Sequence, residues 1–154
     1  MKTLMYRAIE LSIENVLNGR GGPFAALVAK ENEIIAMGTN LVTPTNDPTA
    51  HAEIVAIREA CKKLNHFQLT GCEVYASCEP CPMCMAAIYW ARPARVFYAN
   101  TREDAARIGF DDSFIYDQLQ LPTDRRSIPT VQLMRREALV AFRRWESKTD
   151  KIRY

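Results

Sequence analysis

Residues 72–91 read CEVYASCEPCPMCMAAIYWA and join a strand to a helix through a cysteine-rich loop. The residues CEVYAS predict the strand. Proline is well tolerated at the first position of a helix, so we expect a helix from Pro82 to Ala91. Cys81 then lies at the N-cap and Cys84 at the third helical position, where both sulfur atoms can face one point. The positive end of the helix dipole lowers the pKa of such thiols, which favours the thiolates that bind metal.

A second segment, DPTAHAEIVAI at residues 47–57, places His51 and Glu53 at the start of an apolar-periodic helix. Together with the two thiolates, the imidazole of His51 supplies three of the four ligands of a tetrahedral zinc site. A fourth position left to water is typical of catalytic zinc. We expect Glu53 to lie beside the metal without ligating it. There it would accept a proton from the water, whose pKa zinc lowers to about 7.

The rest of the chain alternates helical and strand patterns. We predict helices over residues 4–17, 49–64, 102–108 and 135–147, strands over residues 24–30, 33–40, 94–100 and 130–134, and loops over residues 41–48 and 109–118. The buried face of the second helix is expected to hold Ile54, Ile57, Cys61 and Leu64. This alternation predicts an α/β domain in which helices cover a mixed sheet. Ligand sites in such sheets lie beyond the carboxyl ends of the strands.

The bulk composition bounds the class of protein. A length of 154 residues fits one domain, and a net charge of +2 does not favour nucleic acid or a membrane surface as a partner. Charges interrupt the N-terminal residues 1–18, and no later apolar run is long enough to span a bilayer, so we expect a cytoplasmic protein. Five cysteines, three of them at positions 78, 81 and 84, suit metal binding or catalysis better than a disulfide framework.

The crowded cysteines allow a second interpretation, in which Cys78 is the fourth ligand of a closed structural zinc site. That interpretation leaves Glu53 without a function. An iron–sulfur cluster would need a cysteine near position 88, which is Ile88. In the loop predicted over residues 109–118, Asp111 and Asp112 could be turn residues rather than functional carboxylates.

The order H-x-E and then P-C-x-x-C is the signature of zinc-dependent nucleobase deaminases. Here it is His51-Ala52-Glu53 followed by Pro80-Cys81-Pro82-Met83-Cys84. The chain resembles the cytidine deaminase superfamily and, within it, the bacterial guanine deaminases. The resemblance covers nearly the whole chain and is carried by GGPFAALV, NDPTAHAE, CEPCPMC, AIYWARP, GFDDSFIY and the tail AFRRWESKTDKIRY.

The resemblance implies a three-layer α/β/α fold that binds one zinc ion per chain through His51, Cys81 and Cys84. It implies hydrolysis of guanine to xanthine and ammonia in purine metabolism. In that reaction Glu53 would move a proton onto the ring, and Asp112 would be a second catalytic carboxylate near the leaving amine.

The resemblance also implies a set of substrate-binding residues, namely Asn40, Phe24, Ala52 and Tyr154. Residues 1–154 would form a single deaminase-like domain. Residues 135–154 would be a C-terminal tail exchanged between the two chains of a homodimer. The expected partners are therefore a purine base, water and a second copy of the chain, with neither nucleic acid nor a membrane.

Other functions remain open at the level of sequence. Guanosine deaminase is the first alternative, although a closing tail would leave little room for ribose. A tRNA adenosine deaminase shares the zinc motif, but the near-neutral charge counts against it. The arginines of residues 135–147 most simply form a solvated helix face, with RNA contact as the lesser alternative. A zinc-stabilised binding module without turnover is the alternative from a different class.

Overall fold

The structure is a computed structural model that describes residues 1–153 and divides into two compact units, Met1–Asp112 and Ser113–Tyr154. Tyr154, expected to bind substrate, lies outside the described residues. The elements of the first unit follow in the order α1 (Lys2–Leu17), β1 (Ala25–Lys30), β2 (Glu33–Thr39), α2 (Val42–Thr45), α3 (Ala52–Leu64), β3 (Glu73–Cys78), α4 (Pro82–Ala91), β4 (Arg95–Asn100) and α5 (Arg102–Arg107).

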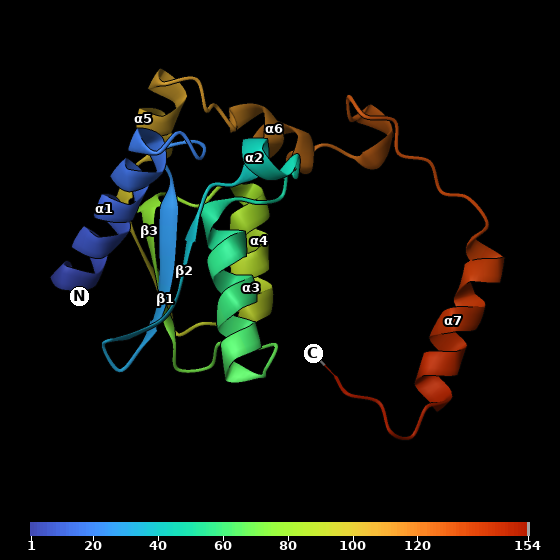
Figure 1. The fold of residues 1–154 in the computed structure, drawn as a ribbon. Helices are drawn as coiled ribbons and strands as arrows, with labels where there is room; N and C mark the ends of the chain where they lie inside the picture. Colours follow the sequence, from blue (N-terminus) through green and yellow to red (C-terminus); the bar gives the residue numbers. More distant parts are fainter. Residues whose placement is uncertain (154) are drawn as a thin grey trace. The chain divides into compact units, whose positions relative to one another are not determined.

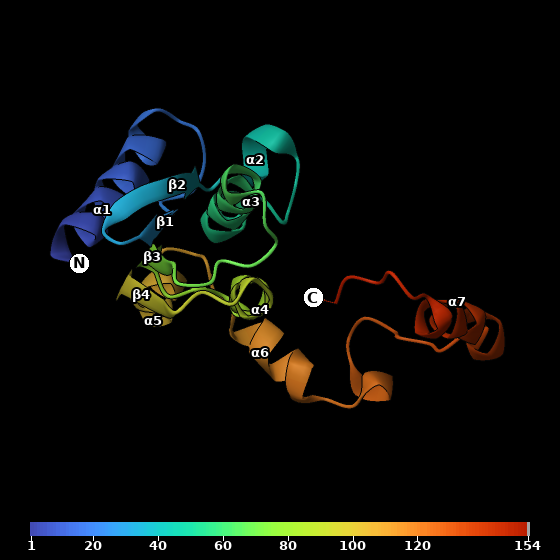
Figure 2. The same cartoon turned by 90° about the horizontal axis from the view of Figure 1, so that it is seen from below.

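The described residues form one mixed sheet of four strands in the order β2-β1-β3-β4. Strand β1 is antiparallel to β2 and to β3, whereas β3 and β4 are parallel and are joined through α4. The β1–β2 hairpin turns at Glu31 and Asn32, whose φ values of 52° and 67° are the positive pair that a tight two-residue turn requires. Figure 1 shows α1 on one side of this sheet and α3 and α4 on the other, and Figure 2 shows the same layers from below. The predicted α/β architecture is confirmed.

The α1 side of the sheet has a core of large apolar side chains. Leu4 and Ala8 of α1 are buried against Leu27 of β1 and Tyr75 of β3. The ring of Tyr75 also stacks on Phe97 of β4, with centroids 4.8 Å apart. Apolar contacts on this face therefore pack α1 against the two central strands, β1 and β3.

The α3 side is packed with small residues. Ala56 and Ala60 of α3 are completely buried against Val28 and Val74 of the central strands. A Cβ atom added to Gly38 of β2 would lie 2.3 Å from the backbone oxygen of Ala52 and 2.5 Å from the nitrogen of Ala56. The first turn of α3 therefore rests directly on the backbone of β2.

The structure corrects three predictions for the first unit: one helix boundary, one loop and one buried helix face. Helix α3 begins at Ala52 rather than at residue 49, because residue 51 has an extended backbone and serves as the N-cap. Residues 41–48, predicted as a loop, contain the short helix α2. The predicted buried face of α3 is partly wrong, because Leu64 is 36% exposed and alanines occupy the most buried positions of the helix.

The second unit contains α6 (Ser113–Gln120), the 3-10 turn η1 (Thr123–Arg125) and α7 (Arg135–Ser147). The helix predicted over residues 135–147 is confirmed, whereas the loop predicted over 109–118 gives way to α6 from Ser113 onwards. The strand predicted over residues 130–134 is wrong, because that segment has no strand partner in the described chain and Val131 and Leu133 are each 81% exposed. Over residues 1–153, every helix is too short or too polar to cross a membrane.

Candidate metal centre

Two helix N-termini meet at the candidate site. His51 is the N-cap of α3 and Cys81 is the N-cap of α4, and both have extended backbone angles. In the described chain neither side chain makes a capping hydrogen bond. The usual Ser, Thr, Asp or Asn at such a position would stabilise each helix by about 1 kcal/mol. The two positions are thus occupied by side chains that serve the site rather than the helix.

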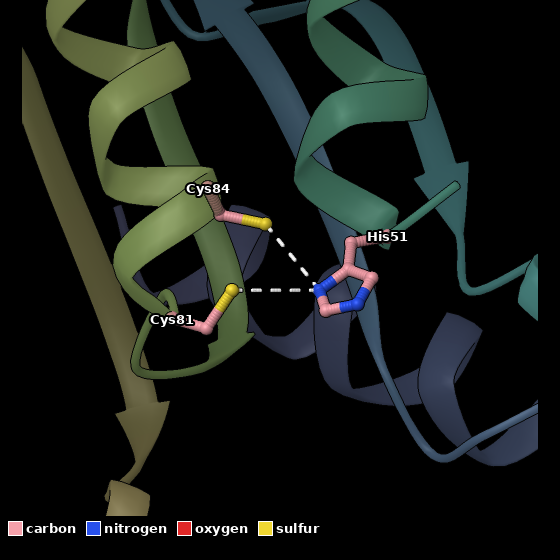
Figure 3. Close-up of side chains that lie close together, drawn as sticks. All are labelled: His51, Cys81 and Cys84. Atoms are coloured by element: carbon pink, nitrogen blue, oxygen red, sulfur yellow. Dashed lines mark hydrogen bonds between the residues drawn. The ribbon is translucent and has the colours of Figure 1, made fainter. Parts of the chain in front are cut away.

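The side chains of His51, Cys81 and Cys84 converge on one point (Figure 3). The Nδ1 atom of His51 lies 3.6 Å from Sγ of Cys81 and 3.5 Å from Sγ of Cys84. All three donor atoms lie within 4.8 Å of one another. The predicted N-cap position of Cys81 is also confirmed, with Pro82 at the start of α4.

These distances fit the donor set of a zinc ion. With Zn–S of about 2.3 Å and Zn–N of about 2.0–2.1 Å, tetrahedral angles place nitrogen and sulfur ligands about 3.6 Å apart. The two observed nitrogen–sulfur distances agree with that value to within 0.1 Å. One imidazole and two thiols fit a zinc site with no rearrangement of the helices that carry them.

Cys78 does not join this group. Its Sγ donates a hydrogen bond to the backbone oxygen of Thr101 at 3.5 Å, and burial raises the pKa of its thiol to about 11. Among residues 1–153, the side chains of the metal-binding types that gather around one point are His51, Cys81 and Cys84. The described geometry therefore favours three protein ligands over the closed four-ligand arrangement.

The pKa shifts of the three donors also favour metal binding. The interaction with Cys84 lowers the pKa of Cys81 to about 4, with a further contribution from His51. The same interaction and burial raise the pKa of Cys84, and the contact with Cys81 raises that of His51. The surroundings of Cys81 thus favour its thiolate, which is the form that binds metal.

Glu53 lies beside the cluster. Its carboxylate oxygen accepts a hydrogen bond from Sγ of Cys84 at 3.4 Å, and the residue is only 8% exposed. Burial raises the pKa of this carboxyl group. His51, two positions before Glu53, is the N-cap of α3 and faces the same point. In a helix interior, side chains two positions apart point in different directions, whereas the extended N-cap brings these two together. A buried carboxyl with a raised pKa is suited to take up and release a proton.

Asn40 and Phe24 lie on neighbouring backbone segments that end β2 and precede β1. The backbone N–H of Asn40 donates to the oxygen of Phe24 at 3.0 Å. The side-chain oxygen of Asn40 accepts from the N–H of Val42 at 3.3 Å. The backbone N–H of Leu41 donates to the oxygen of Ala50 at 2.9 Å, which links the end of β2 to the residue that precedes His51.

Asp112 and Phe110 belong to the segment that ends the first unit. Asp112 is half-buried, and burial followed by the charge of Cys81 raises the pKa of its carboxyl group, so it lies within electrostatic range of the cluster. The ring of Phe110 meets that of Phe24 edge-on, with centroids 4.9 Å apart and planes at 89°. Sequence reasoning missed Phe110, although it stands in the quoted segment GFDDSFIY.

The structure also locates the other residues considered in the sequence analysis. Ala52 is the first residue of α3 and is 1% exposed. Cys61 and Cys72 belong to the apolar core beneath α3, and His66 caps the turn after α3 through a hydrogen bond from the N–H of Gln68.

Comparison with known proteins agrees with this geometry. Residues 1–100 match the family described as the cytidine and deoxycytidylate deaminase zinc-binding region, and they include the three convergent donors. The chain belongs to this deaminase family. Its membership accounts for both halves of the zinc signature and for the mixed sheet that carries them.

Within the deaminase family the likeness to one relative extends over the full chain. Guanine deaminase of Bacillus subtilis is 52% identical over 153 residues, which cover 99% of this chain and 98% of the relative. Its crystal structure superposes with a TM-score of 0.97 over the same shares of the two chains. A structure of guanine deaminase from Nitrosomonas europaea is 38% identical with a TM-score of 0.66, covering 71% of this chain and 63% of that one. The tRNA-specific adenosine deaminase of Aquifex aeolicus is 47% identical but covers only 50% of this chain and 51% of its own length.

Proposed function

We propose that this deaminase hydrolyses guanine to xanthine and ammonia. The observation that carries the proposal is the extent of the likeness to the Bacillus subtilis guanine deaminase, which continues through the segments after residue 100. By contrast, the likeness to the tRNA-specific enzyme covers half of the chain. The zinc region alone would assign only a deaminase, whereas the rest of the chain selects guanine.

One zinc ion per chain would be held by His51, Cys81 and Cys84. When bound, zinc supplies the acidification of water that hydrolysis at neutral pH requires. The three donors come from two helix starts, so the positive ends of both helix dipoles stabilise the thiolates. A site with three protein ligands leaves room for water, which a structural site does not.

Glu53 would carry the proton that the reaction moves. In the overall reaction a water oxygen bonds to the ring carbon that bears the amino group, the carbon–nitrogen bond breaks and ammonia leaves. The carboxylate of Glu53 would accept one proton from the water and deliver it to a ring nitrogen, and the second proton of the water would go to the amino group, which leaves as ammonia. The contact of Glu53 with Cys84 at 3.4 Å and its burial support this role, because a buried carboxyl group beside the metal donors would exchange its proton slowly with bulk water.

The base would be oriented by residues around the centre. The side-chain oxygen of Asn40 accepts from the N–H of Val42, and the NH₂ end of the amide would donate to an acceptor on the base. Guanine offers such acceptors at O6 and N7. Phe24, fixed by the edge of Phe110, would pack on the ring, and Asp112 would face the leaving amine. Ala52 at the buried start of α3 and Tyr154 complete the proposed substrate contacts.

We infer a homodimer, and the exposed apolar side chains of the second unit support it. Large apolar side chains there are 62–81% exposed: Ile128, Val131, Leu133, Met134 and Phe142. Large apolar patches are rare on the surfaces of monomeric proteins, and a partner that covered these side chains would remove them from water. We infer that a second copy covers them and that residues 135–154 are the exchanged tail. Light scattering on the purified protein should give twice the mass of one chain, and a monomeric mass would reject the dimer.

A cytoplasmic location fits the chemistry of the thiols. All five cysteines are free, and Cys81 and Cys84 must stay reduced to bind metal. The substrate that we propose is a small purine base, so no membrane or nucleic-acid partner is needed.

The function is tested by ammonia release from guanine, guanosine, adenine, cytosine and cytidine, with zinc content measured on the same sample. We expect turnover of guanine well above that of the other four. The Glu53→Gln variant, with unchanged zinc, is the matched control for contaminating activity. A preference for guanosine, or conversion of adenosine in a tRNA anticodon loop without action on guanine, would overturn the proposal.

A further inference from the structure

Asn15, in the last turn of α1, ties together the backbone segments that hold Asn40 and Phe24. Its side-chain NH₂ group donates one hydrogen bond to the oxygen of Gly22 at 2.9 Å and another to the backbone oxygen of Asn40 at 3.1 Å. The oxygen of Gly22 also accepts from the N–H of Phe24 at 2.8 Å, and the oxygen of Phe24 accepts from Asn40 at 3.0 Å. One amide therefore closes a ring of hydrogen bonds through both segments.

The chemistry of these contacts requires an amide at position 15. Both acceptors are carbonyl oxygens, so only the NH₂ end of the side chain can bind them, and its two hydrogens serve one acceptor each. The approach is close on all sides. A Cβ atom added to Gly21 would lie 2.3 Å from the oxygen of Asn40 and 3.3 Å from the side-chain nitrogen of Asn15.

The position is unusual for a residue whose only task is stability. Asn15 is 2% exposed, and it shares the buried stripe of α1 with Leu4, Ala8 and Leu11. Its side-chain oxygen, also buried, accepts no hydrogen bond from the described residues. A buried acceptor without a donor costs free energy. An apolar side chain of similar size would remove this unpaired oxygen, but it would also remove the donor to the backbone oxygen of the 7% exposed Asn40. What Asn15 does that an apolar residue does not is hold the backbone carbonyls of Gly22 and Asn40.

We propose that Asn15 is a positioning residue, which sets the backbone at Asn40 and Phe24 and so determines how tightly the purine base is held. The inference rests on the proposed function, because it assumes that these two residues meet guanine. Asn15 would act through them and touch neither the substrate nor the metal. Its loss should weaken base binding and leave the three metal donors as they are, since those belong to α3 and α4.

The test compares Asn15→Leu and Asn15→Ala with Ser12→Ala. Ser12 lies three residues earlier on α1 and is 8% exposed, but within residues 1–153 its hydroxyl bonds only to the oxygen of Ile9 in its own helix, at 2.7 Å. It is therefore a matched buried polar residue whose described hydrogen bond does not reach the segments of Phe24 and Asn40. The smaller Asn15→Ala leaves room for water at the two carbonyls if the leucine variant does not fold.

Guanine affinity is measured by calorimetry in a Glu53→Gln background, where turnover does not consume the ligand, and KM and kcat are measured with Glu53 present. We expect loss of the Asn15 amide to raise Kd and KM for guanine about tenfold or more, because displacement of a positioning group by about 1 Å can cost 10²-fold. We expect kcat to fall less, zinc content to stay at the wild-type level, and Ser12→Ala to change neither constant by more than about twofold.

Two results separate the inference from the proposed function. If guanine binds with wild-type affinity to both Asn15 variants, Asn15 is not a positioning residue, while the function stands. If the unaltered protein releases no ammonia from guanine, the proposed function fails and this inference fails with it. A parallel loss of zinc in the Asn15 variants would also reject the inference, because it would show a general disturbance of the fold.

Discussion

Replacement of Gly38 by alanine tests whether the metal centre depends on the close contact between β2 and α3. The new Cβ atom would lie 2.3 Å from the oxygen of Ala52, 2.5 Å from the nitrogen of Ala56 and 3.0 Å from Cβ of Val55. Ordinary contact begins at 3.4 Å, so the carbonyl of Ala52 must retreat by about 1.1 Å. Two of the three obstacles are backbone atoms, and no side-chain rotation relieves them. The first turn of α3 must move as a unit.

The size of the effect follows from that displacement. His51 directly precedes Ala52, so its imidazole moves with the helix start, whereas metal–ligand distances tolerate only about ±0.2 Å. We expect zinc affinity to fall by tenfold or more and kcat/KM for guanine to fall by about 10², as for a 1 Å misplacement near the chemistry. Overpacking at this position should also lower the free energy of unfolding by about 1–3 kcal/mol.

Zinc affinity is measured by competition with a chromophoric chelator, and stability by thermal unfolding of the zinc-free and zinc-loaded protein. Gly19→Ala is the control. That residue has a left-handed φ of 62° but nothing within 4 Å of its added Cβ, so alanine there strains the chain without moving α3. Wild-type zinc affinity in Gly38→Ala, with a folded protein, would refute the reasoning.

Further outcomes follow from the site. Glu53→Gln should keep zinc and the fold but lose more than about 10² in kcat, as loss of a proton carrier should, and near-normal turnover would remove Glu53 from the mechanism. Cys81→Ala should release zinc and lower the melting temperature, whereas Cys78→Ala should retain zinc by elemental analysis; the reverse order would restore the closed site. Deletion of residues 142–154 should reduce turnover more than zinc binding, because a closing tail excludes water from the site, and equal kcat/KM in the shortened chain would reject that role.

The convergence of the metal donors could be predicted from local rules. Proline at position 82 marks a helix start, which places Cys81 at the N-cap and Cys84 one turn on, as observed. His51 lies thirty residues before Cys81 in the sequence. The prediction that the two meet depended on the need of a zinc ion for further ligands and not on a local rule. The helix boundary was less accurate: α3 begins at Ala52, because the N-cap itself carries a ligand where a Ser, Thr or Asp would have signalled the start.

Other features depend on tertiary contacts that periodicity does not encode. Ala56 and Ala60 form the most buried face of α3 because Gly38 lets the helix approach the sheet closely. A prediction from apolar periodicity instead favours the large residues Ile54, Ile57 and Leu64 as the buried face. Residues 130–134 have strand-forming side chains, but a strand requires a partner, and none of the described chain pairs with them. Asn15 looks like a member of a helical stripe until the carbonyls that it holds are in place.

The account depends on a metal held by one imidazole and two thiolates with one position left open. X-ray absorption at the zinc edge, on protein loaded with zinc and free of excess metal, measures that coordination directly. We predict two sulfur neighbours at about 2.3 Å and two light-atom neighbours at about 2.0–2.1 Å, one of which is exchangeable with solvent. A shell of three sulfur atoms would place Cys78 on the metal, and the absence of bound zinc would remove the hydrolytic centre altogether.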